Sequence, residues 1–219
     1  MKYVLMCGGY YNMFDKPKQM IKIGKEMLFE RTLRLLRENG VTDIAISSNR
    51  PEFEEIYPQY DVEFIKMNNK CTIVQKGKQV GCWLTAFPDM GDTPACYLFC
   101  DVLYSPQAIK TIVETETDDI EFFASAPPFG GDDYHREWAE PFGFKVVNQR
   151  HFRESIMETI LYDKWYRPPI AWELWQVIKD TPRCVIDYTN YTAINDYTCD
   201  IDYPEEIAEM EEVLKKYEV

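Results

Sequence analysis

Short apolar runs alternate with helical patterns along the first half of this chain, and the alternation predicts an α/β fold. Four strand-like apolar runs occupy 3–7, 43–47, 62–65 and 96–100. Between the first two, apolar residues from Glu26 to Asn39 recur at helical spacing, and Gly40 supplies the expected C-terminal stop. Strand, loop, helix and strand in this order form a βαβ unit, which favours a parallel sheet.

The second half continues the alternation less regularly. Its predicted elements are a helix start at 81–86, a helix at 106–116, strands at 120–126, 142–147 and 184–186, a loop leading into a short helix at 165–178, and a helix at 204–217. The proline- and glycine-rich run 127–133 has the composition of a loop. We therefore predict one domain over 1–219, with a small lid or acceptor-binding insertion somewhere within 127–180.

Composition narrows the classes of partner. A chain of 219 residues with 46% hydrophobic residues can bury the core of a single domain. Its formal net charge of −13 repels nucleic acid, and no apolar run approaches the roughly 20 residues that span a bilayer. The seven cysteines include no Cys-x-x-Cys pair, which favours reduced, buried thiols in a cytoplasmic protein and no zinc site. We expect a small molecule or another protein as partner.

A glycine pair follows the first predicted strand. Gly8-Gly9 can turn backbone N–H groups toward an anion because no Cβ blocks the approach, although many ordinary turns use such a pair. Lys16-Pro17-Lys18 comes shortly afterwards and adds positive charge on a stiffened backbone. The two features together favour phosphate binding.

Three aspartates are candidates for holding a divalent cation. Asp101 ends a predicted central strand, where open α/β sheets bind their ligands. Asp200 and Asp202 flank Ile201 just before the last helix. Carboxylates from separate strand ends supply hard oxygen ligands for Mg²⁺. The alternatives are a turn carboxylate at Asp101 and ordinary helix-start acids at the other two positions.

An ordered series of segments resembles the NTP-dependent nucleotidyltransferases, which include sugar-1-phosphate nucleotidyltransferases, choline-phosphate cytidylyltransferases and the molybdopterin guanylyltransferase type. The series consists of Leu5-Met6-Cys7-Gly8-Gly9, then 16–25, 29–36 and 40–44, and later 99–102 and 200–206. The resemblance covers the first fifty residues well and returns at the two acidic segments. It implies a Rossmann-like three-layer sandwich with a mixed, mostly parallel central sheet.

The resemblance also implies a reaction and a set of site residues. A phosphate-bearing acceptor would attack the α-phosphorus of an NTP, and pyrophosphate would leave. Lys18 and Lys16 would be catalytic, and Mg²⁺ would bind Asp101, Asp200 and Asp202. The nucleotide-binding residues implied are Met6, Cys7, Gly8, Gly9, Lys18, Lys76, Gly81 and Asp101.

The loop departs from the family pattern in one respect. The family usually has a third glycine and an arginine after the first two glycines, whereas Tyr10-Tyr11-Asn12 follows Gly9 here. Either the two lysines replace the missing charge, or the triphosphate is held differently, or transfer has been lost.

The acceptor side is less well defined by the sequence. Two groups of aromatic and charged residues could hold a phosphorylated amine through cation–π attraction and arginine–phosphate contacts. The acceptor candidates are His135, Arg136, Trp138, Trp172 and Glu173. The competing interpretation is that these aromatic residues belong to the core or to a partner contact.

These observations predict a cytoplasmic, Mg²⁺-dependent nucleotidyltransferase with CTP as the favoured nucleotide and a small phosphorylated acceptor. A sugar-1-phosphate acceptor is the nearest alternative. A glycosyltransferase of the related nucleotide-sugar-binding fold and a non-catalytic nucleotide-binding protein also stay open, as does a homodimer.

Overall fold

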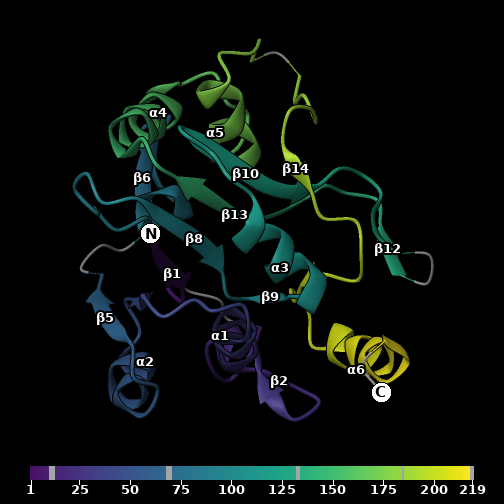
Figure 1. Cartoon of the computed structure of the whole chain (residues 1–219). Helices are drawn as coiled ribbons and strands as arrows, with labels where there is room; N and C mark the ends of the chain where they lie inside the picture. The colour runs from purple at the N-terminus through teal and green to yellow at the C-terminus, as the bar shows by residue number, and fades with distance from the viewer. Residues whose placement is uncertain (10–12, 68–70, 132–133, 184, 218–219) are drawn as a thin grey trace.

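A sheet with helices on both faces forms the centre of the protein (Figure 1). The computed structural model describes residues 1–9, 13–67, 71–131, 134–183 and 185–217. Within these ranges the strand order is β14-β10-β13-β8-β1-β4-β5. The strands are β1 (Lys2–Met6), β4 (Ile44–Ser48), β5 (Glu63–Lys66), β8 (Ala95–Phe99), β10 (Ile120–Ser125), β13 (Glu140–Val146) and β14 (Thr192–Ala193).

The remaining elements are helices, single 3₁₀ turns and two-stranded pairs. The helices are α1 (Leu28–Glu38), α2 (Pro51–Ile56), α3 (Pro106–Glu114), α4 (Gln149–Leu161), α5 (Ala171–Ile178) and α6 (Glu205–Tyr217), and the 3₁₀ turns are η1 (Lys18–Met20), η2 (Tyr57–Gln59) and η3 (Trp83–Ala86). The pairs are β2 (Lys22–Ile23) with β3 (Glu26–Met27), β6 (Thr72–Gln75) with β7 (Lys78–Gly81), β9 (Val102–Leu103) with β15 (Cys199–Asp200), and β11 (Phe129–Gly131) with β12 (Tyr134–Arg136).

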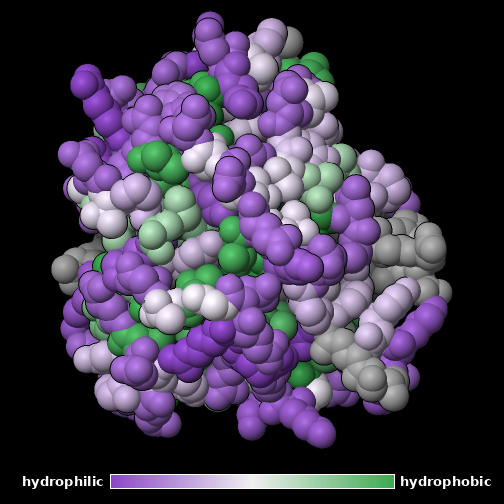
Figure 2. Space-filling view, in the orientation of Figure 1, coloured by the Kyte–Doolittle hydropathy of each residue, from purple (hydrophilic) through white to green (hydrophobic). Residues whose placement is uncertain are grey.

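The two faces of the sheet bury separate apolar clusters. Leu5 and Leu98 face the cluster covered by α1, α3 and α6, whereas Val4 and Tyr97 face the cluster covered by α4 and α5. Successive residues of a strand point to opposite faces, so the central runs are apolar at every position. The sheet and the helices on its two faces thus form three layers. Hydrophilic residues cover most of the face seen in Figure 2.

The sheet is mixed and mostly parallel, as the sequence predicted. β1 pairs in parallel with β4 and β8, and β4 pairs in parallel with β5. β13 is antiparallel to both β8 and β10, and it approaches β8 very closely at Gly143. A Cβ on this glycine would lie 2.4 Å from the Tyr97 carbonyl oxygen. Glycine therefore permits β13 to enter the parallel sheet beside β8.

Several expectations about local structure need correction. Gly81 ends β7, and Trp83–Ala86 form one 3₁₀ turn instead of starting a longer helix. The predicted loop 127–133 contains β11. Val185 and Ile186 belong to no strand, while Cys184 is outside the described residues. Helix α4 was not predicted.

The cysteines behave as the composition indicated. Within the described residues Cys7, Cys71, Cys82, Cys96, Cys100 and Cys199 are buried free thiols. No helix of the described ranges is long and apolar enough to cross a membrane.

Candidate active site

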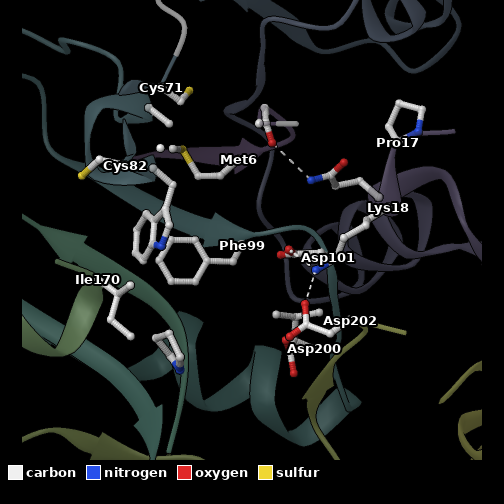
Figure 3. A pocket seen from close by; sticks show the side chains of 18 of the residues that line it. Met6, Pro17, Lys18, Cys71, Cys82, Phe99, Asp101, Ile170, Asp200 and Asp202 are labelled. Carbon is white, nitrogen blue, oxygen red and sulfur yellow. Dashed lines mark hydrogen bonds and ion pairs between the residues drawn. The ribbon is translucent and has the colours of Figure 1, made fainter. Parts of the chain in front are cut away.

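A cavity of about 610 Å³ opens where β1 and β8 end. Segments that are distant in sequence line it, and they bring positive, negative and apolar groups together (Figure 3). The lining residues are Met6, Gly8, Gly9, Pro17, Lys18, Gln19, Arg50, Cys71, Thr72, Gly81, Cys82, Trp83, Ala86, Phe99, Asp101, Val102, Glu140, Pro141, Pro168, Pro169, Ile170, Asp200 and Asp202. Its position at the carboxyl ends of parallel strands is where open α/β sheets bind ligands.

Lys18 carries positive charge into this cavity. It opens the 3₁₀ turn η1, and the residue is only 6% exposed. Its Nζ lies 3.0 Å from Oδ2 of Asp101 and 2.6 Å from Oδ1 of Asp202 (Figure 3). Burial alone would lower the pKa of Lys18, but the negative charges of the two aspartates outweigh it and raise the pKa above its ordinary value. The ammonium is therefore charged throughout the physiological range.

The β9–β15 pair and helix α6 position the aspartates. Asp200 pairs with Val102, and the backbone N–H of Ile201 donates to the carbonyl oxygen of Asp101 at 2.9 Å. At the start of α6, Oε2 of Glu206 accepts from the backbone N–H groups of Asp202 and Tyr203, at 2.7 and 2.9 Å. These contacts fix the backbone that carries each acid.

The carboxylates of the cavity exceed the cations close to them. Burial, followed by the charges of Asp202 and Asp101, raises the pKa of Asp200 well above its ordinary value. Glu140, at the first position of β13, has its pKa raised in the same direction by burial and then by the neighbouring aspartates. Like charges that are crowded in a partly desolvated space disfavour each other's ionised forms. The site therefore has more carboxylates than positive charges to balance them.

A divalent cation fits this charge pattern and this donor set. Carboxylate oxygens are the ligands that Mg²⁺ prefers, and Lys18 already places a cation between two of them. No three Asp, Glu, His or Cys side chains among the described residues already converge as a metal site. The ammonium of Lys18 lies between the carboxylates that would have to converge.

The glycine loop also lines the cavity. Gly9 has φ of +100°, and its N–H donates to Oδ1 of Asn49 at 3.1 Å. A Cβ on Gly8 would lie 2.8 Å from Sδ of Met67, so both glycines suit the close path of the loop. The departure from the family pattern begins at residue 10, and residues 10–12 lie outside the described residues.

One side of the cavity is apolar. The rings of Trp83 and Phe99 meet edge to face with centroids 5.0 Å apart, and Met6 and Ile170 extend this surface (Figure 3). Trp83 comes from η3, which the hairpin β6–β7 delivers to the cavity. The face of an aromatic ring on this apolar side can stack against a planar ring of a ligand.

Several predicted site residues lie outside the cavity lining. Cys7, the residue after β1, is fully buried in the core, and Lys16 is exposed. Lys76 and Gly77 have φ of +50° and +74° at the tip of the β6–β7 hairpin, so Lys76 serves as an exposed turn residue.

Three of the predicted acceptor residues, Trp138, Trp172 and Glu173, also lie outside the lining. Trp172 is buried and packs edge to face on Phe122, while Trp138 is exposed. The carboxylate of Glu173 is buried, receives the N–H of Ile170 at 3.0 Å, and pairs with Arg167 at 2.8 Å. His135 and Arg136 belong to β12, and their side chains are outside the described part of the structure.

Some lining residues were not identified as site residues from the sequence. Arg50 and Glu140 bring charge to the cavity, and Phe99 and Ile170 belong to its apolar wall. Arg50 follows the end of β4, so the rule for strand carboxyl ends could have identified it. Glu140 lies at the beginning of an antiparallel strand, which no local pattern shows to be at the same edge.

Comparisons with known proteins point to one family. The model of the MobA-like NTP transferase domain matches residues 3–127. By sequence, no curated protein matches the chain.

Solved structures show the same fold over almost the whole chain. The inositol-1-phosphate CTP transferase from T. maritima aligns with a TM-score of 0.63 at 12% identity, covering 98% of this chain and 95% of that one. A putative glucose-1-phosphate thymidylyltransferase from Bacillus anthracis gives 0.59 at 12% identity, with coverages of 97% and 94%. The CTP:phosphocholine cytidylyltransferase from Streptococcus pneumoniae gives 0.55 at 13% identity, with coverages of 97% and 98%.

Proposed function

Because the chain belongs to the MobA-like NTP transferase family, we propose that it transfers a nucleotidyl group from an NTP to a small phosphorylated acceptor and releases pyrophosphate. The observation that carries the proposal is the convergence of Lys18, Asp101 and Asp202 beside the Gly8-Gly9 loop in one cavity. A glycine loop lets phosphates approach the backbone closely, a lysine supplies positive charge, and an acidic cluster beside them suits a divalent ion.

The bound NTP would lie across the cavity. Its phosphates would approach Gly8, Gly9 and Lys18, with Arg50 as a further positive group, and its base would lie on the wall of Trp83 and Phe99. Arg50 would compensate for the arginine that the glycine loop lacks. We propose CTP as the nucleotide, which two of the structural neighbours use according to their names.

Asp101, Asp200 and Asp202 would hold Mg²⁺, which supplies positive charge to phosphate oxygens and orients them. The residues of the chain would neutralise further charge and position the phosphates. Lys18 would neutralise charge on the reacting phosphates, and the glycine loop would fix their position. In-line displacement at phosphorus depends on positioning and charge neutralisation more than on a protein nucleophile.

The reaction balances without another reactant. A phosphate oxygen of the acceptor forms a bond to the α-phosphorus, and the bond from the α-phosphorus to the oxygen of the β-phosphate breaks. Pyrophosphate carries away the electron pair. Glu140 also lines the cavity, and we propose that it faces the acceptor.

Pyrophosphate release tests the proposal directly. The protein is incubated with each of the four NTPs, Mg²⁺ and a panel of phosphorylated sugars, polyols and amino alcohols. We expect release with one nucleotide and one class of acceptor, CTP being the first choice. Nucleotide binding without pyrophosphate release in every combination would favour a non-catalytic nucleotide-binding protein.

Two variants connect the activity to the site. Lys18→Ala and Asp101→Ala should each lower kcat/KM by about 10²–10³-fold, as the loss of a charge-stabilising group in a desolvated site does. Lys22→Ala removes an exposed charge near η1 and serves as the control. Wild-type rates in either site variant would remove that residue from the mechanism.

A further inference from the structure

Lys18 lies between two of the aspartates that would hold the metal ion. Its ammonium contacts Asp101 at 3.0 Å and Asp202 at 2.6 Å, and its side chain is almost completely buried (Figure 3). The aspartate side chains are 32% and 41% exposed, so they stay open to the cavity on their other sides. The cation of the site is thus part of the protein itself.

An ammonium and a divalent cation compete for these oxygens. An ammonium and a divalent ion held by the same two carboxylates repel each other, and the double charge of the metal ion strengthens this repulsion. A metal ion that binds both carboxylates must therefore displace Lys18 or bind weakly. The absence of a preformed three-ligand cluster among the described residues agrees with this arrangement.

The phosphates of a bound nucleotide would offer the ammonium of Lys18 a second set of oxygens inside the same cavity. Gly8 and Gly9 line it as well, and a triphosphate lying on them would offer oxygens with more negative charge than the two carboxylates. Lysine suits such an exchange because it is a point charge on a flexible stem, without the fixed fork geometry of arginine.

We propose that Lys18 is a resident counter-ion that competes with the divalent cation for Asp101 and Asp202 and is drawn away by the triphosphate. The inference rests on the metal site of the proposed function. It adds a statement about the coupling of the two ligands: the divalent cation binds tightly only together with the nucleotide. By linkage, each of the two ligands tightens the binding of the other by the same factor.

Mn²⁺ binding without nucleotide tests the competition. The free ion is measured by electron paramagnetic resonance at fixed pH and ionic strength, with the wild-type protein and with Lys18→Met. We expect the variant to bind Mn²⁺ about 5- to 150-fold more tightly, the usual range for coupled sites. Equal affinities would overturn the proposal.

Two controls separate direct competition from a general field effect. Lys22→Met removes an exposed charge close to η1, and Arg50→Gln removes a second positive charge that lines the cavity and pairs with Glu52 at 3.1 Å. We expect Lys22→Met to bind Mn²⁺ as the wild type does, and Arg50→Gln to change the affinity much less than Lys18→Met. An increase in Arg50→Gln as large as that in Lys18→Met would overturn the proposal.

A crystal structure of the wild-type protein with Mn²⁺ and a non-hydrolysable CTP analogue gives a second test that needs no variant. Nζ of Lys18 should lie on the phosphates and away from Asp101 and Asp202. A lysine still bonded to both aspartates beside a bound metal refutes the exchange.

The two proposals can fail separately. Cation-dependent pyrophosphate release with equal Mn²⁺ affinities in wild type and Lys18→Met refutes only the competition. Tighter Mn²⁺ binding in the variant without pyrophosphate release from any substrate pair refutes the transfer reaction and leaves the role of Lys18 intact.

Discussion

The close approach of β13 to β8 depends on the missing side chain of Gly143, and Gly143→Ala should separate the two strands. An added Cβ would lie 2.4 Å from the Tyr97 carbonyl oxygen and 3.0 Å from Cδ2 of Leu98. Leu98 can rotate, but the Tyr97 carbonyl is part of the sheet ladder and cannot move alone. The backbone must therefore shift by several tenths of an ångström.

The expected loss of stability follows from these contacts. Overpacking a well-packed core destabilises by about 1–3 kcal/mol, and a clash with backbone belongs at the upper end. Alanine also restricts the unfolded chain, which offsets about 0.4–1 kcal/mol. The net loss is about 2 kcal/mol, and at about 2–4 °C per kcal/mol for a chain of this size Tm should fall by about 4–8 °C.

Thermal unfolding followed by circular dichroism measures this change. Gly81→Ala is the matched control, because an added Cβ there meets no atom within 4 Å. Its Tm should stay within about 2 °C of the wild type. If Gly143→Ala unfolds at the wild-type temperature, then the strands are not held at the spacing described, and the placement of Glu140 at the cavity edge loses its structural basis.

Three further changes test the site and the core. Gly9→Ala forces an L-residue to φ near +100°, which costs about 1–2 kcal/mol of backbone strain. We expect NTP binding, measured by titration calorimetry, to weaken about tenfold. Unchanged affinity would show that the loop does not hold phosphates. Glu140→Ala should lower the acceptor kcat/KM by about tenfold with little effect on NTP binding, because it removes a hydrogen-bonding group from the acceptor side in either protonation state. An effect on NTP alone contradicts the place of Glu140 on the acceptor side. Burial raises the pKa of the Cys96 thiol from 9.0 to about 12. Above about pH 9 the unfolded chain therefore loses a proton that the folded protein keeps, and the free energy of unfolding falls as pH rises. In urea unfolding between about pH 9 and 11, Cys96→Ala should show an alkaline slope that is shallower by up to about 1.4 kcal/mol per pH unit; parallel curves would refute this.

The sequence predicts the parallel half of the fold well, because its strands are buried on both faces. Such strands are apolar at each position, and the helix between the first two has a clear apolar stripe and a glycine at its end. Helix α4 was missed because its sequence, with Ser155 and Thr159 on the buried side, lacks a strong apolar stripe. Val185 was predicted in a strand but is 75% exposed, since a short apolar run alone does not show burial.

The site was predicted in part, and the limit is the direction in which side chains point. The spacing of Lys16 and Lys18 does not show which lysine faces inward, whereas the 3₁₀ turn that begins at Lys18 turns that residue into the cavity. Trp172 and Glu173 have the residue types of a ligand pocket, but α5 buries both of them. The convergence of Asp101 and Asp202 depends on the β9–β15 pair, which two-residue strands do not reveal in a sequence.

The hydrogen bond from Lys18 to Asp202 joins positions 184 residues apart, and this separation has a consequence for the order of folding. Closing so long a loop loses chain entropy that only the surrounding packing can offset, whereas the β1–α1–β4 unit assembles from near neighbours. We therefore expect the acidic side of the cavity to be completed among the last events of refolding. Pulse-labelling hydrogen exchange should protect the amides of β4 before that of Ile201, and the opposite order would show that the distant segments meet early.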